Sequence, residues 1–314
     1  MDINIKKISI VVPCYNEEET LPFFCDALKQ IENVMDMLEF EYVFVDDGSS
    51  DATLLILREL AKMNSYVKYI SFSRNFGKES ALLAGLEAAT GDFVAVMDAD
   101  LQDPPDLLPQ MYIAIIDEGF DCAAARRATR KGEPFIRSIF AKGFYWLVNK
   151  ISDVQMIDGA RDFRLMTRRM TNAVLSLREY NRFSKGLFGW VGFPTKWIDY
   201  ENTPRVAGVT KWSFWKLFIY SIDGIAAFST KPLALSSLFG ILFCLFAFLG
   251  VLLIIVRWLI FGDPVAGWAS TVTIVLFAQG IQLFCIGILG QYLARTYMEG
   301  KQRPVYIIKE KSHL

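Results

Sequence analysis

Two long uncharged segments constrain the fold of this chain more than any other feature of its sequence. Residues 232–256 form a run of 25 residues without a charged side chain, and residues 264–294 form a run of 31. At a rise of about 1.5 Å per residue, a helix of either length crosses a hydrocarbon core of about 30 Å. The short connection between the runs predicts a tight hairpin of two membrane-spanning helices, at about residues 232–258 and 268–293.

Positive charges flank the expected hairpin on one side of the membrane. They are Lys211, Lys216 and Lys231 before it and Arg295, Lys301, Arg303, Lys309 and Lys311 after it. By the positive-inside rule, the large amino-terminal region and the segment after the hairpin are expected in the cytoplasm. The first residues lead into a strand pattern and show no signal peptide.

Composition narrows the chemistry further. A formal net charge of −1 excludes a generally basic nucleic-acid binder. The five cysteines lack a Cys-x-x-Cys pair and His313 is the single histidine, so neither a zinc site nor a disulfide framework is predicted. A catalytic base must therefore be a residue other than histidine.

Residues 8–125 alternate between strand-like and helix-like patterns. Strands are expected at residues 8–12, 42–45, 67–72, 93–97 and 122–125, with helices at 21–31, 52–63, 78–89 and 105–118. This alternation indicates an α/β domain with a mostly parallel sheet and crossover helices on both faces. A further strand and helix are expected at 162–177, and another strand at 188–198.

Two acidic clusters each follow an apolar run of strand length. Asp46 and Asp47 follow residues 42–45, and Asp98 and Asp100 follow residues 93–97. Open α/β sheets bind ligands at the carboxyl ends of their strands. Two carboxylates spaced two apart on an extended segment point the same way and can hold a divalent cation with help from a diphosphate. Such residues are also common as turn and cap residues, but two clusters together favour a metal and nucleotide site.

Two aromatic segments precede the hairpin. Residues 135–148 predict an amphipathic helix that can lie on the membrane surface. Residues 212–228 suit either a helix in the membrane interface or an ordinary buried helix, and the sequence leaves this choice open.

Four motifs occur in an order and spacing that resemble family-2 glycosyltransferases. They are residues 10–18 (IVVPCYNEE), residues 45–51 (VDDGSSD), Asp98-Ala99-Asp100 with Gln102, and residues 162–165 (DFRL). Within that family the chain resembles the polyisoprenyl-phosphate glycosyltransferases over essentially its whole length. The resemblance implies a glycosyltransferase A-type nucleotide-binding domain at 1–210, an interfacial helix at 211–231, a two-helix hairpin at 232–295 and a basic cytoplasmic tail at 296–314.

The resemblance also implies roles for individual residues. The nucleotide is expected to contact Pro13, Tyr15, Glu17, either Asp46 or Asp47, Lys78 and Asp98. Asp98 and Asp100, with Gln102 beside them, are the expected ligands of Mg²⁺ or Mn²⁺. Asp162 matches the carboxylate proposed as catalytic base, and Asp100 is counted with it as catalytic. Arg205 and Lys211 match a mobile loop that closes on the phosphates.

The chemistry of such a transfer fits a chain with one histidine. A departing nucleoside diphosphate needs a cation and nearby Arg or Lys. A lipid phosphate is already largely ionised at neutral pH, since its second pKa is about 6, so one carboxylate can orient it. Candidates for holding phosphate are Arg126, Arg127, Arg137 and Arg164. The alternatives are a solvated basic loop near Arg126 and, for Arg161 and Arg164, ion pairing that keeps Asp162 ionised.

The second spanning segment has a face of small residues and amides. This face comprises Gly280, Gly287 and Gly290 with Gln279, Gln282 and Gln291. Such residues are common at helix packing surfaces in membranes, either within the hairpin or between copies. A homo-oligomer is expected, and a tetramer is one possibility.

The expected function is inverting transfer of a hexose, foremost glucose from UDP-glucose, to undecaprenyl phosphate at the cytoplasmic face of the bacterial inner membrane. Other donors remain open, namely GDP-mannose, an N-acetylhexosamine or an aminoarabinose derivative. A processive polysaccharide synthase is disfavoured because no Gln-x-x-Arg-Trp motif is present. A soluble transferase would not need the spanning segments, and a catalytically silent scaffold would not need these carboxylates together.

Overall fold

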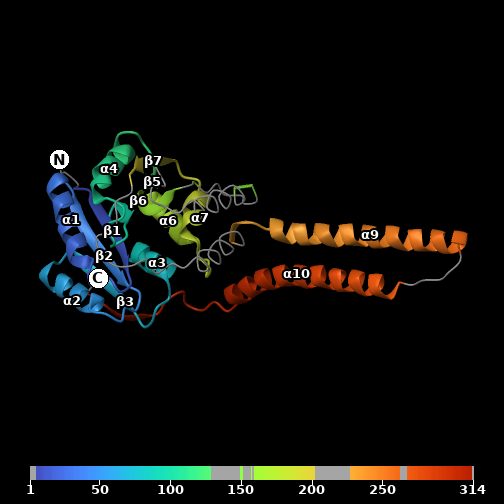
Figure 1. The fold of residues 1–314 in the computed structure, drawn as a ribbon. Coiled ribbons are helices and arrows are strands. Elements are labelled where there is room, and N and C mark those ends of the chain that lie inside the picture. The colour runs from blue at the N-terminus through green and yellow to red at the C-terminus, as the bar shows by residue number, and fades with distance from the viewer. Residues whose placement is uncertain are drawn as a thin grey trace.

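The computed structural model describes residues 5–128, 149–150, 157, 159–201, 227–261 and 267–312. Figure 1 shows an α/β domain from which a long helical hairpin extends. The domain contains an eight-stranded sheet in the order β7-β5-β6-β4-β1-β2-β3-β8. The helices expected at residues 135–148 and 212–228 lie outside the described residues, apart from residues 227 and 228.

The centre of the sheet is parallel, as the alternating sequence pattern predicted. Its strands are β1 (Lys7–Cys14), β2 (Glu39–Asp46), β3 (Val67–Phe72) and β4 (Phe93–Val96). The helices between them are α1 (Leu21–Val34), α2 (Thr53–Met63) and α3 (Lys78–Ala88). β1 pairs in parallel with both β2 and β4, and β2 pairs in parallel with β3.

The remaining elements of the domain complete the sheet. They are the 3₁₀ turn η1 (Pro105–Leu107), α4 (Leu108–Ile116), β5 (Cys122–Arg127), β6 (Ala160–Thr167), α6 (Arg168–Ser176), α7 (Ser184–Trp190), β7 (Thr195–Tyr200) and β8 (Ile308–Lys311). β6 runs antiparallel to β4 and β5, and β8 runs antiparallel to β3. The fold is therefore a mostly parallel sheet with antiparallel strands added on either side.

The core has two layers because side chains alternate along each strand. On β1, Ile8, Ile10 and Val12 pack in the layer that contains residues of α1, α2 and α4. Val11 points to the opposite layer, which contains residues of α3 and α6. Helices thus cover both faces, which confirms the predicted α/β architecture.

The strand expected at 188–198 is wrong in its first half. Phe188 belongs to α7, and β7 begins only at Thr195. The segment between them contains Gly192, whose φ of 72° lies in the left-handed region, and then Pro194, which has no backbone N–H to donate. The apolar side chains there resemble a strand, but the backbone turns.

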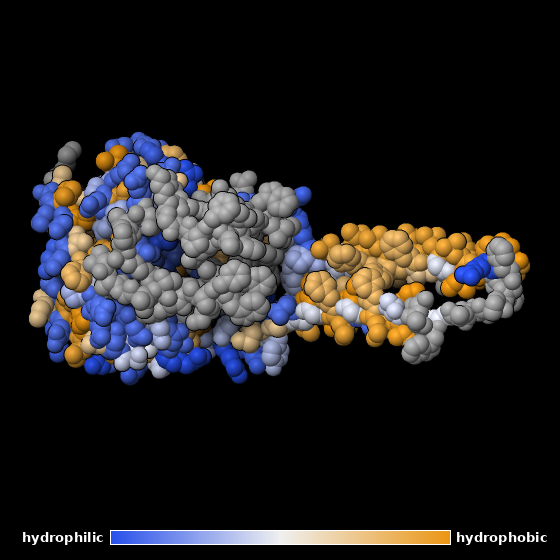
Figure 2. Space-filling model, viewed as in Figure 1, coloured by the Kyte–Doolittle hydropathy of each residue, from blue (hydrophilic) through white to orange (hydrophobic). Residues whose placement is uncertain are grey.

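The hairpin consists of α9 (Lys231–Phe261) and α10 (Trp268–Gly300). Residues 231–257 and 271–300 are long and apolar enough to cross a membrane. Figure 2 shows the apolar surface of the hairpin beside a largely hydrophilic domain. The predicted pair of carboxy-terminal apolar helices is confirmed.

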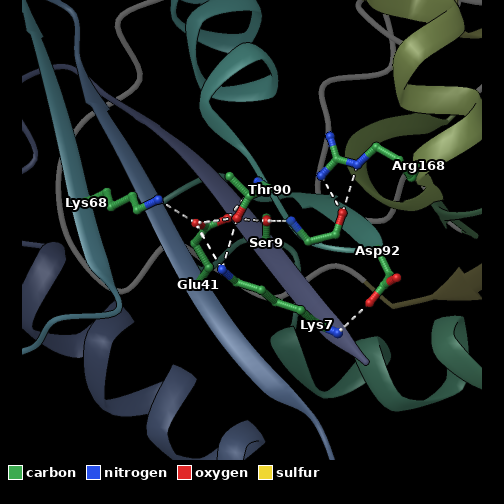
Figure 3. A network of polar contacts seen from close by, with 8 residues as sticks. Lys7, Ser9, Glu41, Lys68, Thr90, Asp92 and Arg168 are labelled. Carbon is green, nitrogen blue, oxygen red and sulfur yellow. Dashed lines mark hydrogen bonds and ion pairs between the residues drawn. The ribbon is translucent and has the colours of Figure 1, made fainter. Parts of the chain in front are cut away.

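A buried glutamate network joins the first residues of the central strands (Figure 3). Glu41 on β2 is 1% exposed and accepts hydrogen bonds from Ser9 at 2.5 Å, from Lys68 at 2.8 Å and from the backbone and hydroxyl of Thr90. Burial by itself raises the pKa of Glu41, but these donors outweigh it and lower that pKa to about 2. This edge is opposite to the one that carries the acidic motifs, so the network stabilises the sheet.

Candidate active site

The candidate site lies at the carboxyl ends of the parallel strands. Asp46 is the last residue of β2, and Asp98 follows β4 by two residues. β6 runs antiparallel to β4 with Val96 opposite Arg164, and continuing this register places Asp98 opposite Asp162. Two carboxylates that are far apart in sequence therefore meet at one edge of the sheet.

Lys78 joins these two carboxylates. Its ammonium lies 2.7 Å from Asp98 Oδ1 and 2.5 Å from Asp162 Oδ2. Lys78 is the first residue of α3, and it follows Gly77, which has a φ of 97°. Burial would lower the pKa of Lys78, but Asp162 and Asp98 hold it above its ordinary value.

Asp162 has a strongly positive environment. Burial would raise its pKa, but the charges of Lys78, Lys185 and Arg164 outweigh burial and hold the pKa well below the usual range of an aspartate. Lys185 lies in the first turn of α7 and was not singled out from the sequence. Its contribution depends on how α7 packs beside β6, and no local motif reveals that packing.

Asp100 lies in a turn, whereas the sequence argument assumed an extended segment. β4 ends at Val96, and Leu101 has a φ of 53°. Asp100 Oδ1 accepts a hydrogen bond of 3.1 Å from the backbone N–H of Gln102. The turn, not strand alternation, therefore determines where the Asp100 carboxylate lies.

Arg161 pairs with Asp103 and not with Asp162. Its Nε donates to Asp103 Oδ1 at 2.7 Å, and its Nη2 donates to Gln102 at 3.4 Å. Tyr200 also donates to Asp103. These contacts tie the turn after β4 to β6 and β7, so Arg161 supports the turn that carries Asp100.

The acidic motif at residues 45–51 holds the loop that precedes Lys78. Asp47 is buried and accepts hydrogen bonds from the backbone N–H groups of Phe76 at 2.6 Å and Gly77 at 3.0 Å. Burial raises the pKa of Asp47 to about 6 despite these donors. Asp46 accepts from Ser49 N–H at 2.9 Å and Ser71 Oγ at 2.7 Å.

Gly48 brings the same two loops into close contact. Its φ is 68°, and a Cβ added there would lie 2.4 Å from the carbonyl carbon of Arg74 and 2.7 Å from Asn75 N. The backbone of the motif at 45–51 therefore lies directly against the loop that ends at Lys78.

The expected nucleoside contacts share this edge. Pro13 pairs with Val45, and Cys14 pairs with Asp46. Tyr15 is 38% exposed, and the Glu17 carboxylate accepts a hydrogen bond of 2.6 Å from Thr20. Pro13, Tyr15 and Glu17 thus lie beside the acidic motif at residues 45–51. Their contact with a nucleoside stays a prediction.

The expected phosphate-binding arginines have other contacts. Arg126 forms a bidentate pair with Asp199 at 2.5 and 2.7 Å. The backbone N–H of Arg127 donates to Gly159 O at 3.0 Å, and a phosphate role for its side chain stays a prediction. Arg164 is buried, lies 3.8 Å above the Phe188 ring and donates to backbone carbonyls of residues 161 and 162. Arg137, Arg205 and Lys211 lie outside the described residues.

Sequence reasoning also missed Glu79 and Ser184. The backbone N–H of Ser184 donates to Glu79 at 2.9 Å, and the Ser184 hydroxyl donates to the same carboxylate. Burial raises the pKa of Glu79. This contact fastens the first turn of α7 to the first turn of α3, beside Lys78.

Comparison with known proteins identifies the family to which this chain is similar. The model of the family described as glycosyl transferase family 2 matches residues 9–175. CsbB of Bacillus subtilis strain 168 is 45% identical over 304 residues, covering 96% of this chain and 91% of that protein. Bactoprenol glucosyl transferase of Shigella phage SfX is 42% identical over 305 residues, covering 97% of this chain and 99% of that protein. A crystal structure of glucosyl-3-phosphoglycerate synthase from Mycobacterium tuberculosis is 20% identical, with a TM-score of 0.45, over 70% of this chain and 78% of that one.

The family match covers the strands whose carboxyl ends carry these carboxylates. Together, the match and the site identify the protein as a glycosyltransferase. The chain belongs to glycosyl transferase family 2. The expectation of a mostly parallel α/β domain followed by two apolar helices is confirmed.

Proposed function

We propose that the protein transfers glucose from UDP-glucose, with inversion, to a polyprenyl phosphate such as undecaprenyl phosphate. The observation that carries this proposal is the Lys78 bridge, which brings Asp98 and Asp162 to one point. A donor diphosphate and an acceptor phosphate must meet at such a point. The name of the phage relative, a bactoprenol glucosyl transferase, supports both the sugar and the lipid.

The carboxylates fit a divalent cation that is shared with a substrate. Among the described residues, no group of three His, Cys, Asp or Glu could hold a metal by itself. Asp98 and Asp100 supply two hard oxygen ligands, which suits Mg²⁺ or Mn²⁺ completed by diphosphate oxygens and water. Such an ion would stabilise the negative charge of the departing diphosphate. We assign it to Asp98 and Asp100, with Gln102 at the same turn.

The side chains of the chain itself supply the remaining steps. Lys78 offsets the repulsion between two carboxylates and can exchange a carboxylate contact for a phosphate oxygen. Asp162 orients the acceptor phosphate, which attacks as an oxyanion already largely free of its proton. Arg164 holds the backbone that carries this carboxylate, because its guanidinium donates to the carbonyl oxygens of residues 161 and 162.

The two apolar helices support a reaction at a membrane. α9 begins and α10 ends beside the domain, whereas the end of α9 and the start of α10 lie far from it (Figure 1). This arrangement and the flanking positive charges support the proposal that the domain and the segment after α10 both lie on the cytoplasmic side. The phosphate of a polyprenyl acceptor lies at headgroup level, next to this junction.

The small-residue face of α10 supports association between copies. Among the described residues, none would lie within 4 Å of a side chain added at Gly280, Gly287 or Gly290. We therefore propose that these glycines allow close approach of a second copy. The mass of the detergent-solubilised protein measures this association.

A donor panel tests the proposed function. Purified full-length protein is incubated with undecaprenyl phosphate and UDP-glucose, UDP-N-acetylglucosamine or GDP-mannose, and lipid products are identified by mass spectrometry. Product is expected with UDP-glucose, is expected to form about two orders of magnitude more slowly in Asp162→Asn, and is expected to form normally in the control Asp26→Asn, whose carboxylate is 73% exposed. A polymer product, or no lipid-linked hexose with any donor, refutes the proposal.

A further inference from the structure

The segment after the membrane hairpin returns to the catalytic domain as a strand. β8 pairs antiparallel with β3, with Ser71 opposite Glu310 and Phe72 opposite Ile308. Arg58 on α2 fastens β8 through two hydrogen bonds to Glu310, at 2.7 and 2.6 Å. We call residues 304–311 the return segment.

The return segment contacts both the first and the last turn of α3, the helix that begins at Lys78. The carbonyl of Val305 accepts a hydrogen bond of 3.4 Å from Ser80, in the first turn of α3. The hydroxyl of Tyr306 donates to Glu87, in the last turn. The carbonyl of Ile307 accepts a hydrogen bond of 2.9 Å from Ser73 N–H, where the loop before α3 begins.

An aromatic stack extends this contact to the loop itself. The Tyr306 ring lies parallel to Phe72, with centroids 4.9 Å apart and planes at 17°. Phe72 in turn meets the edge of Phe76 at 5.8 Å. Phe76 stands two residues before Lys78, and its backbone N–H is held by Asp47. The loop is thus fixed by Asp47 on one side and by the Phe72–Tyr306 stack on the other.

We propose that the return segment positions Lys78 for transfer, with Tyr306 as its central positioning residue. This inference rests on the proposed function of the Lys78 bridge. Only a few residues separate Tyr306 from the end of α10 at Gly300, so one short segment links the membrane hairpin to the bridge. Misplacement of a catalytic group by about 1 Å costs roughly a hundredfold in rate, which makes the position of this loop matter for turnover.

Substitutions in the return segment separate positioning from mere stability. Tyr306→Ala removes the stack, and Tyr306→Phe keeps the ring but loses the contact with Glu87. Arg58→Ala loosens β8 at a site that does not touch the loop before Lys78. With proteins compared well below their unfolding temperatures, Tyr306→Ala is expected to lower kcat about tenfold with an unchanged Kd for UDP, whereas Tyr306→Phe and Arg58→Ala stay within about twofold of wild type.

A double-mutant cycle and hydrogen exchange complete the test. If Tyr306 acts through Lys78, adding Tyr306→Ala to Lys78→Met should lower kcat less than about twofold further. Amide exchange of residues 73–80 should rise in Tyr306→Ala and not in Arg58→Ala, a readout that needs no substrate. The proposal is overturned if amide exchange of residues 73–80 is unchanged in Tyr306→Ala. It is also overturned if Tyr306→Ala lowers kcat about tenfold in both the wild-type and the Lys78→Met protein. If the wild type does not glucosylate a polyprenyl phosphate, the proposed function is wrong. The amide exchange of residues 73–80 would then still test whether Tyr306 positions the Lys78 loop.

Discussion

Replacing Glu41 by glutamine should destabilise the domain by about 3 kcal/mol at neutral pH. Folding lowers the pKa of this carboxyl from 4.5 to about 2, and each pKa unit corresponds to about 1.4 kcal/mol. The change also leaves Lys68, 2.8 Å from the carboxylate, without its charge partner. For a domain of this size the expected loss in Tm is roughly 6–12 °C.

The pH dependence of this effect has a definite sign. Because the pKa is lower in the folded protein, the unfolded chain binds the proton more readily, and stability rises with pH across the window from about 2 to 4.5. The contribution of Glu41 is complete above that window and is lost as pH falls through it. The difference in unfolding free energy between wild type and Glu41→Gln should therefore be constant from pH 7 to 5 and about halved near pH 3.

Thermal unfolding of the detergent-solubilised protein, followed by tryptophan fluorescence at several pH values, measures this difference. Glu39→Gln is a matched control on the same strand, since the side chain of Glu39 is exposed. A loss below about 1 kcal/mol in Glu41→Gln would mean that the buried network contributes no more than an exposed ion pair. The same loss in the Glu39 control would equally refute the reasoning.

Three further outcomes are expected. Asp100→Ala, or removal of divalent metal with EDTA, should abolish transfer while the circular dichroism spectrum is kept; full activity after exhaustive metal removal would contradict the metal assignment. Asp162→Asn should lower turnover by about two orders of magnitude or more, with UDP affinity by calorimetry near that of wild type, whereas lost UDP affinity with normal turnover would assign Asp162 to the nucleotide. Gly48→Ala should cost about 1–3 kcal/mol in unfolding free energy, because its φ of 68° and its close approach to Arg74 leave no room for a Cβ; a wild-type Tm would show that the two loops can separate freely.

Much of the fold follows from local patterns in the sequence. Period-two alternation in β1 assigns Ile8, Ile10 and Val12 to one layer and Val11 to the other, as the two core layers show. The length of the uncharged runs predicts the hairpin directly. These features are predictable because each depends on residues that are neighbours in sequence.

The contacts of the site depend instead on register between distant segments. Lys78 gave no local sign that its ammonium would meet both Asp98 and Asp162, because that meeting requires β6 to pair antiparallel with β4. The motif resemblance identified Lys78, Asp98 and Asp162 as site residues but did not predict that Lys78 contacts both carboxylates. Lys185 was missed for the same reason, since only the packing of α7 brings its charge near Asp162.

β8 was missed for a different reason. Its four residues, Ile308 to Lys311, carry three charges and read as a solvated basic tail. Charged residues are common on edge strands, where they discourage pairing with other chains. The sequence therefore showed its charge but not its place beside β3, which Arg58 and the backbone of β3 determine.

The helical hairpin contacts the catalytic domain where the chain enters it and where the chain leaves it. At its entry, Phe228 packs against Gly186 on α7, and Tyr292 of α10 donates to Ser229 O at 2.6 Å. At its exit, Glu299 accepts a hydrogen bond of 2.7 Å from Tyr180 N–H, and β8 then joins the sheet. Removing the chain from residue 232 onward would therefore remove an anchor and also strip β3 of its edge partner and Phe72 of its stacked ring. A truncated domain keeps the Asp47 contacts of the Lys78 loop but loses the Tyr306 ring that stacks on Phe72. A truncation therefore tests the role of the hairpin separately from catalytic geometry only when the return segment is kept.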